Sequence, residues 1–313
     1  MRIVHTLKDI PQGRWVLGMG FFDGFHRGHQ EIAAAVLALA REKKAQPGVL
    51  TFSPHPASVL YPDTVIELLQ TEAEKEQYLA GAGMALSVIL RPTRELLAKS
   101  AADFLSELSG IAGLSGIVCG ENFTFGKGAE GTPAMMETFF QHTGIAVKTL
   151  PLMRSSDIEG RVISSTEIRR LLRKGDVTVA SRLLGRIYSL SGDVVHGFRR
   201  GTEAIGFPTA NLSFGTDRVL PADGVYATYA SIRGHRYPAV TNIGKNPTFD
   251  NEERTIETFI FHFDDHIYGE PFSVEFVKRL RGETKFQSVE ELKRQIALDI
   301  DQAKAILAQG INL

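Results

Sequence analysis

WVLGMGFFDGFHRGHQEIAAAVLALAREKK, residues 15–44, joins an apolar run to an amphipathic run through a glycine-rich turn. Residues 15–21 are predicted to form a buried strand, and residues 29–44 carry apolar side chains at helical spacing. A strand that turns directly into a helix is the start of a βαβ unit. This stretch therefore predicts a parallel sheet in the first half of the chain.

The same alternation continues toward residue 150. Further strands are predicted at residues 48–52, 86–90, 116–119 and 145–150, and further helices at residues 71–82, 101–108 and 133–143. The pattern predicts an α/β domain in which helices cover both faces of the sheet. Ligands of such sheets bind beyond the carboxyl ends of the strands, where the strand order reverses.

The composition of the sequence changes after residue 185, where glycine, proline and aromatic residues become frequent. Strands are predicted at residues 186–194, 225–232, 239–243, 256–263 and 272–277, and one helix at residues 288–308. These elements indicate a small antiparallel β-barrel or sandwich with a C-terminal helix. A helical pair at residues 164–174 and 176–184 precedes the change, so we expect domains at residues 1–184 and 185–313.

Composition excludes several classes of protein. The 313 residues carry 35 Lys+Arg against 36 Asp+Glu, and a net charge of −1 argues against a globally basic nucleic-acid-binding protein. The single cysteine, Cys119, excludes an intrachain disulfide framework and a zinc ribbon. Residues 1–8 lack the apolar core of a signal peptide, and residues 32–40 are too few to span a bilayer. We therefore expect a cytoplasmic enzyme without nucleic-acid or membrane partners.

The turn after the first predicted strand carries a candidate phosphate site. Its glycines do not fit the dinucleotide fingerprint, because Gly24 comes one residue too late after Gly20. The turn instead leads to His26 and His29 at the start of a helix, where free N–H groups attract phosphate. Gly28 between them permits close approach of a nucleotide. A helix cap with incidental surface histidines is the plain alternative, and the full arrangement favours the phosphate site.

This arrangement resembles the nucleotidyltransferase superfamily, in which the His-x-Gly-His motif is paired with a later Ser-rich loop that opens a helix. Residues 163–169, ISSTEIR, fill that place here. Ser164 or Ser165 can cap the helix and reach phosphate, and Arg169 can bind the triphosphate.

Two further motifs, TFSPHP at residues 51–56 and GENFTFG at residues 120–126, make the resemblance closest to bacterial FMN adenylyltransferases. The resemblance implies that His26 and His29 are catalytic. It implies a nucleotide site made by Gly20, Asp23, His26, Gly28, His29, Asn122, Arg161, Ser164, Ser165, Thr166 and Arg169. It implies a flavin site made by Phe52, His55, Asn122 and Phe125, with core packing as the alternative for Phe125. Phe21, Ala85 and Asn122 depart from residues common in this family.

The second domain opens with a glycine- and arginine-rich stretch. Gly197, Arg199, Gly201 and Gly206 could surround the phosphates of ATP, and the hydroxyl of Thr209 and the amide of Asn211 could ligate Mg²⁺. A hairpin with glycine turns and solvated arginines is the alternative.

The Pro208-Thr209-Ala210-Asn211 sequence resembles the signature of riboflavin kinases, and the resemblance continues to residue 286. It implies a small antiparallel barrel in which Glu257 is the general base. It also implies that Arg281 and Glu283 contact flavin, with Arg281 the stronger candidate. Phe259 stands where this family often has His.

Together the resemblances imply FAD biosynthesis. Riboflavin would be phosphorylated to FMN with ATP and Mg²⁺, and FMN would then be adenylylated to FAD with release of pyrophosphate. FMN and FAD would be substrates and products, not prosthetic groups. Two alternatives stay open: a single-activity enzyme with one decayed site, and a non-catalytic flavin-sensing protein. The oligomeric state is not predicted.

Overall fold

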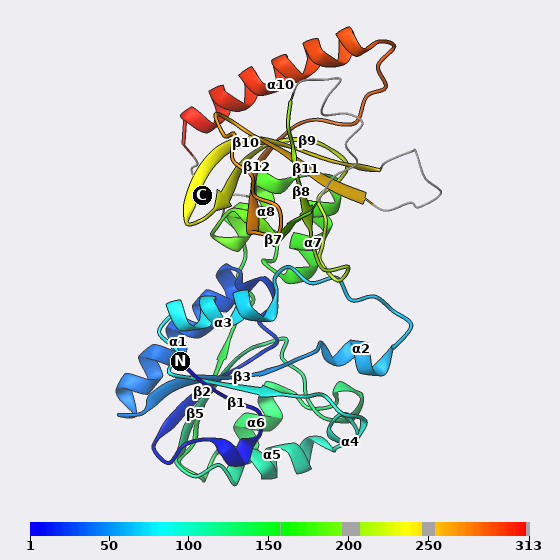
Figure 1. The fold of residues 1–313 in the computed structure, drawn as a ribbon. Helices are drawn as coiled ribbons and strands as arrows, with labels where there is room; N and C mark the ends of the chain where they lie inside the picture. The colour runs from blue at the N-terminus through cyan, green and yellow to red at the C-terminus, as the bar shows by residue number, and fades with distance from the viewer. Residues whose placement is uncertain (157, 159, 196–206, 246–253, 311–313) are drawn as a thin grey trace. The chain divides into compact units, whose positions relative to one another are not determined.

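The chain folds into two compact units, Met1–Ser165 and Thr166–Leu313. The computed structural model describes residues 1–156, 158, 160–195, 207–245 and 254–310 (Figure 1). The division follows Ser165, the first residue of the helical pair α7 (Ser165–Lys174) and α8 (Val177–Leu184), whereas the domains expected from the sequence divide after this pair. The pair packs on the second unit, since the Ala222 amide donates to the Leu172 carbonyl at 3.0 Å.

The first unit is built around a parallel sheet. Its described strands are β1 (Arg2–Val4), β2 (Trp15–Met19), β3 (Gln46–Phe52), β4 (Leu86–Leu90), β5 (Leu114–Gly120) and β6 (Ala146–Leu150), in the order β1-β4-β3-β2-β5-β6. The helices are α1 (Arg27–Glu42), α2 (Pro56–Leu60), α3 (Glu72–Gly81), α4 (Arg94–Leu97), α5 (Ala101–Ser109) and α6 (Pro133–Phe140). The strand order reverses between β2 and β5.

Alternate residues of the strands enter two separate cores. In β2, Leu17 packs with α5 and α6 residues on one face, while Val16 packs with α1 and α3 residues on the other. Figure 1 shows these helices as layers above and below the sheet. Both faces are buried, as expected of parallel strands that read as continuous apolar runs. The predicted α/β architecture is confirmed, although the short edge strand β1 and the helices α2 and α4 were not predicted.

The second unit contains a closed antiparallel barrel among its described residues. Its strands are β7 (Tyr188–Val195), β8 (Ala210–Ser213), β9 (Gly224–Ile232), β10 (His235–Lys245), β11 (Arg254–Ile260) and β12 (Pro271–Arg281), in the order β10-β11-β8-β7-β12-β9. The helix α10 (Val289–Ala308) covers part of its outer face (Figure 1). The barrel is therefore the correct one of the two predicted alternatives.

Two-residue alternation separates the inside of the barrel from its outside. Inside, the fully buried hydroxyls of Thr228, Thr241 and Thr258 bond to one another at 2.8 and 3.0 Å. Outside, Val225 and Val240 pack beneath α10 in one apolar cluster. The outer face next to α10 is thus partly shielded from water, which bears on the site below.

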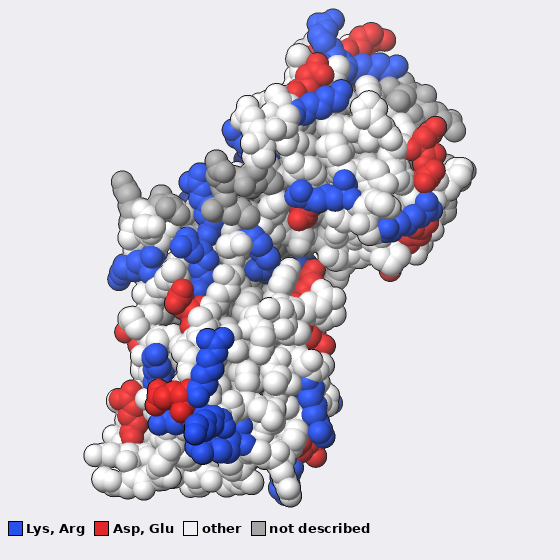
Figure 2. All heavy atoms as spheres, turned by 90° about the vertical axis from the view of Figure 1, so that its left-hand side faces the viewer, with Lys and Arg blue, Asp and Glu red and all other residues white. Residues whose placement is uncertain are grey.

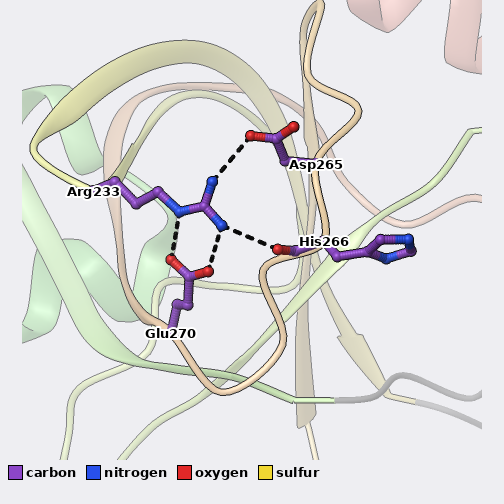
Figure 3. Close-up of polar contacts among 4 residues, drawn as sticks. All are labelled: Arg233, Asp265, His266 and Glu270. Atoms are coloured by element: carbon purple, nitrogen blue, oxygen red, sulfur yellow. Dashed lines mark hydrogen bonds and ion pairs between the residues drawn. The ribbon is translucent and has the colours of Figure 1, made fainter.

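A polar network ties the turn between β9 and β10 to the segment before β12 (Figure 3). The Arg233 guanidinium donates to both carboxylate oxygens of Glu270 at 2.8 and 2.6 Å, to Asp265 at 3.0 Å and to the His266 carbonyl at 3.2 Å. Glu270 raises the pKa of Arg233, and Arg233 lowers that of Glu270. Charges of both signs also stand side by side on the face shown in Figure 2, in keeping with the net charge of −1.

Candidate active sites

The turn after β2 holds two side-chain-bearing residues in left-handed backbone conformations. Phe22 has φ 58° and Phe25 has φ 33°, with Gly24 at φ 75° between them. Such conformations cost a non-glycine residue about 1–3 kcal/mol and persist only where the surroundings hold them.

The surroundings hold this turn by its carbonyl groups. A side chain from a different segment donates to each of four carbonyls: Thr51 to Phe21 at 3.1 Å, Gln70 to Phe22 at 2.7 Å, Ser165 to Asp23 at 2.9 Å and Gln30 to Phe25 at 3.0 Å. The buried carboxylate of Asp23 accepts from the Leu69 amide at 2.9 Å. Asp23 therefore fixes the turn, in addition to any role toward nucleotide.

His26 and His29 lie together at the start of α1. Their rings are stacked at 3.7 Å between centroids, and the His26 carbonyl accepts from the His29 amide at 2.7 Å. His26 is the N-cap of α1 and is buried. A Cβ on Gly28 would lie 3.3 Å from the His26 ring and 3.7 Å from the Ile163 carbonyl, so a larger residue there would press on the His26 ring.

The structure brings the second nucleotide motif to the first. Ser165 bonds to the Asp23 carbonyl, and Ile163 lies against Gly28. Arg161 is exposed, and its carbonyl accepts from the Ser155 amide at 2.8 Å. Thr166 and Arg169 lie on α7 and belong to the second compact unit.

Asn122 follows β5, the neighbour of β2 at the reversal of strand order. It is exposed, and its side-chain oxygen lies 3.0 Å from the position that a Cβ on Gly120 would occupy. Gly20 directly follows β2, and since β2 and β5 pair through Met19 and Cys119, Gly20 lies at the same end of the sheet as Gly120. Gly20 and Asn122 therefore lie at the edge of the sheet where ligands of parallel sheets bind.

Aromatic side chains flank this edge of the sheet. The His55 ring packs edge-on against Phe21 at 4.3 Å, and Phe52 at the end of β3 is half-buried. Phe125, by contrast, is buried in the core against Phe104 at 5.5 Å. The alternative of core packing thus describes the position of Phe125.

Two buried polar residues of this region were not predicted, Gln70 and Lys75. The Lys75 ammonium donates to the Phe52 carbonyl at 3.1 Å and lies 4.9 Å from the centre of the Phe21 ring. Burial lowers the pKa of Lys75, against the opposing effect of Glu72, Asp23 and Glu76. The signal was present in the sequence, since Lys75 shares the apolar face of its helix with Leu79, one turn away.

The second candidate site is a row of side chains across three barrel strands. Glu257 on β11 stands directly opposite Asn211 on β8 and Asn242 on β10. Opposite residues of antiparallel strands project to the same face, which here is the outer one. Burial raises the pKa of Glu257, and the Thr255 hydroxyl partly offsets this effect.

Further residues lie near the row on this outer face. Phe259 packs edge-on against Phe207 at 5.2 Å in the cluster beneath α10, so an apolar residue suits this position. A Cβ on Gly244 would collide with the carboxylate of Glu283, which places Glu283 close to Asn242 in the row.

Arg281 is held by the helix that covers the barrel. Its guanidinium donates to both carboxylate oxygens of the buried Asp299 at 2.9–3.1 Å, and to the Gly282 carbonyl at 3.1 Å. It also lies 5.6 Å from the centre of the Phe286 ring. Arg281 is therefore fixed beside the row through α10.

The predicted ATP residues Gly197, Arg199, Gly201 and Gly206 lie outside the described residues. Thr209 and Asn211 are described and half-buried, and Glu257 stands opposite Asn211. Hydroxyl, amide and carboxylate oxygens fit Mg²⁺, which takes few protein ligands beside phosphate and water. Among the residues that the structure describes, no three His, Cys, Asp or Glu side chains gather as a metal site.

Comparison with known proteins identifies both halves. The family model for FAD synthetase matches residues 9–167, and the model for riboflavin kinase matches residues 184–307. A bifunctional riboflavin kinase/FMN adenylyltransferase of Bacillus subtilis (strain 168) is 35% identical over 303 residues, 96% of this chain and 94% of the relative. The protein of the same name from Escherichia coli (strain K12) is 32% identical over 301 residues, 96% of this chain and 95% of its own.

A solved structure from Streptococcus pneumoniae, described as a macrolide-efflux protein, is 34% identical with a TM-score of 0.87 and covers 97% of this chain and 98% of its own. No helix among the described residues is long and apolar enough to cross a membrane. The two family models and the curated relatives agree with each other, because the relatives' names contain the activities of both models. The chain belongs to the family of bifunctional riboflavin kinase/FMN adenylyltransferases.

Proposed function

We propose that the row around Glu257 transfers the γ-phosphoryl group of ATP to riboflavin. Glu257 accepts the proton of the ribityl hydroxyl as the hydroxyl oxygen attacks the γ-phosphorus, and ADP leaves. The raised pKa of Glu257 supports this role, because a base is most effective when its pKa approaches the working pH.

Thr209 and Asn211 are the residues that would hold Mg²⁺ beside this base, together with the phosphates of ATP. The bound ion supplies charge neutralisation for the transferred group. Gly197, Arg199, Gly201 and Gly206 are proposed to surround the phosphates. Arg281 and Glu283 flank the row and are proposed to orient the flavin.

The edge of the parallel sheet is proposed to carry out the second step. A phosphate oxygen of FMN attacks the α-phosphorus of ATP in line with the departing pyrophosphate, and no covalent enzyme intermediate forms. His26 and His29 donate hydrogen bonds to the oxygens on which negative charge develops. The start of α1 adds the favourable field of the helix dipole.

The remaining residues of this site position the two substrates. We assign nucleotide contacts to Gly20, Asp23, Gly28, Asn122, Arg161, Ser164, Ser165, Thr166 and Arg169. We assign flavin contacts to Phe52, His55 and Asn122. Phe125 acts from the core, where it supports the loop that carries Asn122.

One observation carries the proposal: the stacked His26–His29 pair lies in one unit, and Glu257 lies directly opposite Asn211 in the other. The test is to incubate the protein with riboflavin, ATP and Mg²⁺ and to separate the flavins by chromatography. We expect FMN first and FAD after it. FMN without FAD would identify a decayed adenylyltransferase site. Failure to convert either riboflavin or added FMN would identify a non-catalytic flavin-binding protein.

A further inference from the structure

Residues 69–75, which belong to neither nucleotide motif, lie between the two loops that border the adenylyltransferase site. We call them the 69–75 segment. It bonds to the turn after β2 through Leu69 and Gln70, and to the loop after β3 through Glu72 and Lys75. One short segment therefore contacts both sides of the site. We call the end of β3 and the loop after it, which carry Phe52 and His55, the aromatic wall. We call the turn after β2, which leads to His26 and His29, the nucleotide wall.

Lys75 contacts the aromatic wall. The residue is 5% exposed, its ammonium bonds to the Phe52 carbonyl at 3.1 Å, and the centre of the Phe21 ring lies 4.9 Å from the ammonium. That separation is within the range of a cation–π contact. Since His55 packs edge-on against the same Phe21 ring, one ammonium fixes the backbone of Phe52 and the support of His55.

Gln70 contacts the nucleotide wall. The residue is 3% exposed, and its side-chain amide donates to the carbonyl of Phe22 at 2.7 Å. Phe22 is in the left-handed conformation that directs the chain toward His26. Without this donor, a buried carbonyl would lose its partner in the strained part of the turn.

The 69–75 segment is itself rigid. Thr71 and Glu74 form a reciprocal capping box at the start of α3, with bonds of 2.7 and 3.1 Å. The Ser53 hydroxyl donates to the Glu72 carboxylate and fixes the segment to the loop after β3. Because these bonds do not involve the side chains of Gln70 or Lys75, either of those two contacts can be removed while the bonds that hold the segment remain.

We propose that Gln70 and Lys75 are positioning residues for adenylyl transfer, Lys75 for the flavin and Gln70 for the nucleotide. This inference rests on the proposed function of the site. Neither residue need touch a substrate. Lys75 acts through Phe52, Phe21 and His55, and Gln70 acts through the Phe22 carbonyl and the turn that leads to the histidines.

The test compares Lys75→Met and Gln70→Leu in the conversion of FMN to FAD. Lys75→Met should raise KM for FMN about tenfold, the effect of one charged hydrogen bond, with KM for ATP changed less than about twofold. Gln70→Leu should lower kcat/KM for ATP about tenfold, with KM for FMN changed less than about twofold. Lys75→Arg, which keeps the cation, should restore the FMN value to within about threefold.

Matched controls separate positioning from loss of structure. Gln77→Met, an exposed substitution on the same helix α3, should leave both Michaelis constants unchanged. Fluorescence of Trp15, the single tryptophan of the chain, reports folding of the first unit. Riboflavin phosphorylation, assigned to the other unit, should stay at the wild-type rate in every variant.

Equal effects of the two variants on both substrates, or no effect of either, would overturn the inference. If Lys75→Met abolishes the folded Trp15 signal, Phe21→Leu replaces it, because it removes the ring under the ammonium. An unchanged KM for FMN in Phe21→Leu would then overturn the flavin assignment. Failure of the wild-type protein to convert FMN would refute the proposed function, whereas a working wild type with indifferent variants refutes only the inference.

Discussion

The two candidate sites are held in place by different kinds of bond. At the edge of the parallel sheet, the turn carrying the histidines depends on donors from Gln30, Thr51, Gln70 and Ser165. On the barrel, Glu257 is placed by the backbone register of β8, β10 and β11. The comparison teaches that side-chain donors, three of them from distant segments, hold the turn of the first site, whereas the backbone ladder of the barrel sets the position of Glu257 in the second.

Glu257→Gln should produce the largest effect. The variant keeps the strand register but removes the base, so riboflavin phosphorylation should fall about 10³-fold. Conversion of added FMN to FAD should continue at the wild-type rate. Both rates are measured by chromatography of the flavins. Glu275→Gln, an outward-facing substitution on β12, is the control and should leave both rates unchanged. Loss of both activities in folded Glu257→Gln would contradict two independent sites.

His29→Ala should produce the opposite pattern. Removing one donor to the charge that develops on phosphate should slow FMN adenylylation about 10²-fold. Riboflavin phosphorylation should persist, so FMN accumulates when riboflavin is supplied. His142→Ala, at an exposed position of the same unit, serves as control. Normal FAD formation by His29→Ala would remove this residue from the mechanism.

A pair of Thr→Val substitutions tests the comparison itself. Thr51 and Thr241 are both fully buried, but Thr51 holds the turn after β2 while Thr241 bonds to other threonines inside the barrel. Thr51→Val should slow FMN adenylylation about tenfold, since the Phe21 carbonyl loses a donor. Thr241→Val should change riboflavin phosphorylation less than about twofold, because the ladder of β10 and β11 remains. The rate of each half-reaction is measured for both variants. Equal reductions of the two rates would show that both sites depend on side-chain support.

The smallest effect concerns pH. Burial raises the pKa of Glu257, and a base must be deprotonated to act. Phosphorylation should therefore decline, as pH falls, at a value above the ordinary glutamate pKa of about 4.3. Adenylyl transfer uses no such base and should lack this decline. Profiles of kcat/KM for both half-reactions in the same buffers measure the difference. If kcat/KM of both half-reactions falls at the same acidic pH, the decline is caused by unfolding and not by protonation of Glu257.

Much of this architecture was predictable because it depends on local patterns. The strand at residues 86–90 and the helix at residues 288–308 carry their spacing and caps within a few residues, and both appear within one residue of the predicted bounds. The histidine pair was predictable for the same reason. β8 was not predicted, since its four residues are too few to show an alternation.

Contacts between distant segments could not be predicted. Gln70 and Thr51 act on carbonyls 48 and 30 residues away, and no local pattern encodes those distances. The Arg281–Asp299 ion pair is a similar case. From the motif alone Arg281 is predicted to contact the flavin, and only the fold shows that Asp299 of α10 binds its guanidinium. Lys75 is the exception, since a lysine on an apolar helix face already indicates a buried partner.

The closed barrel and the open sheet also differ in how they could aggregate. The described strands of the barrel close on one another and leave no edge, whereas the sheet ends in β1 and β6. An unpaired strand offers its amides and carbonyls to another chain. Here β1 is only three residues long and begins with Arg2, and β6 carries the exposed Lys148 at its centre. A short edge on one side and a charged one on the other discourage a second molecule from extending the sheet, which favours solubility when the enzyme is concentrated.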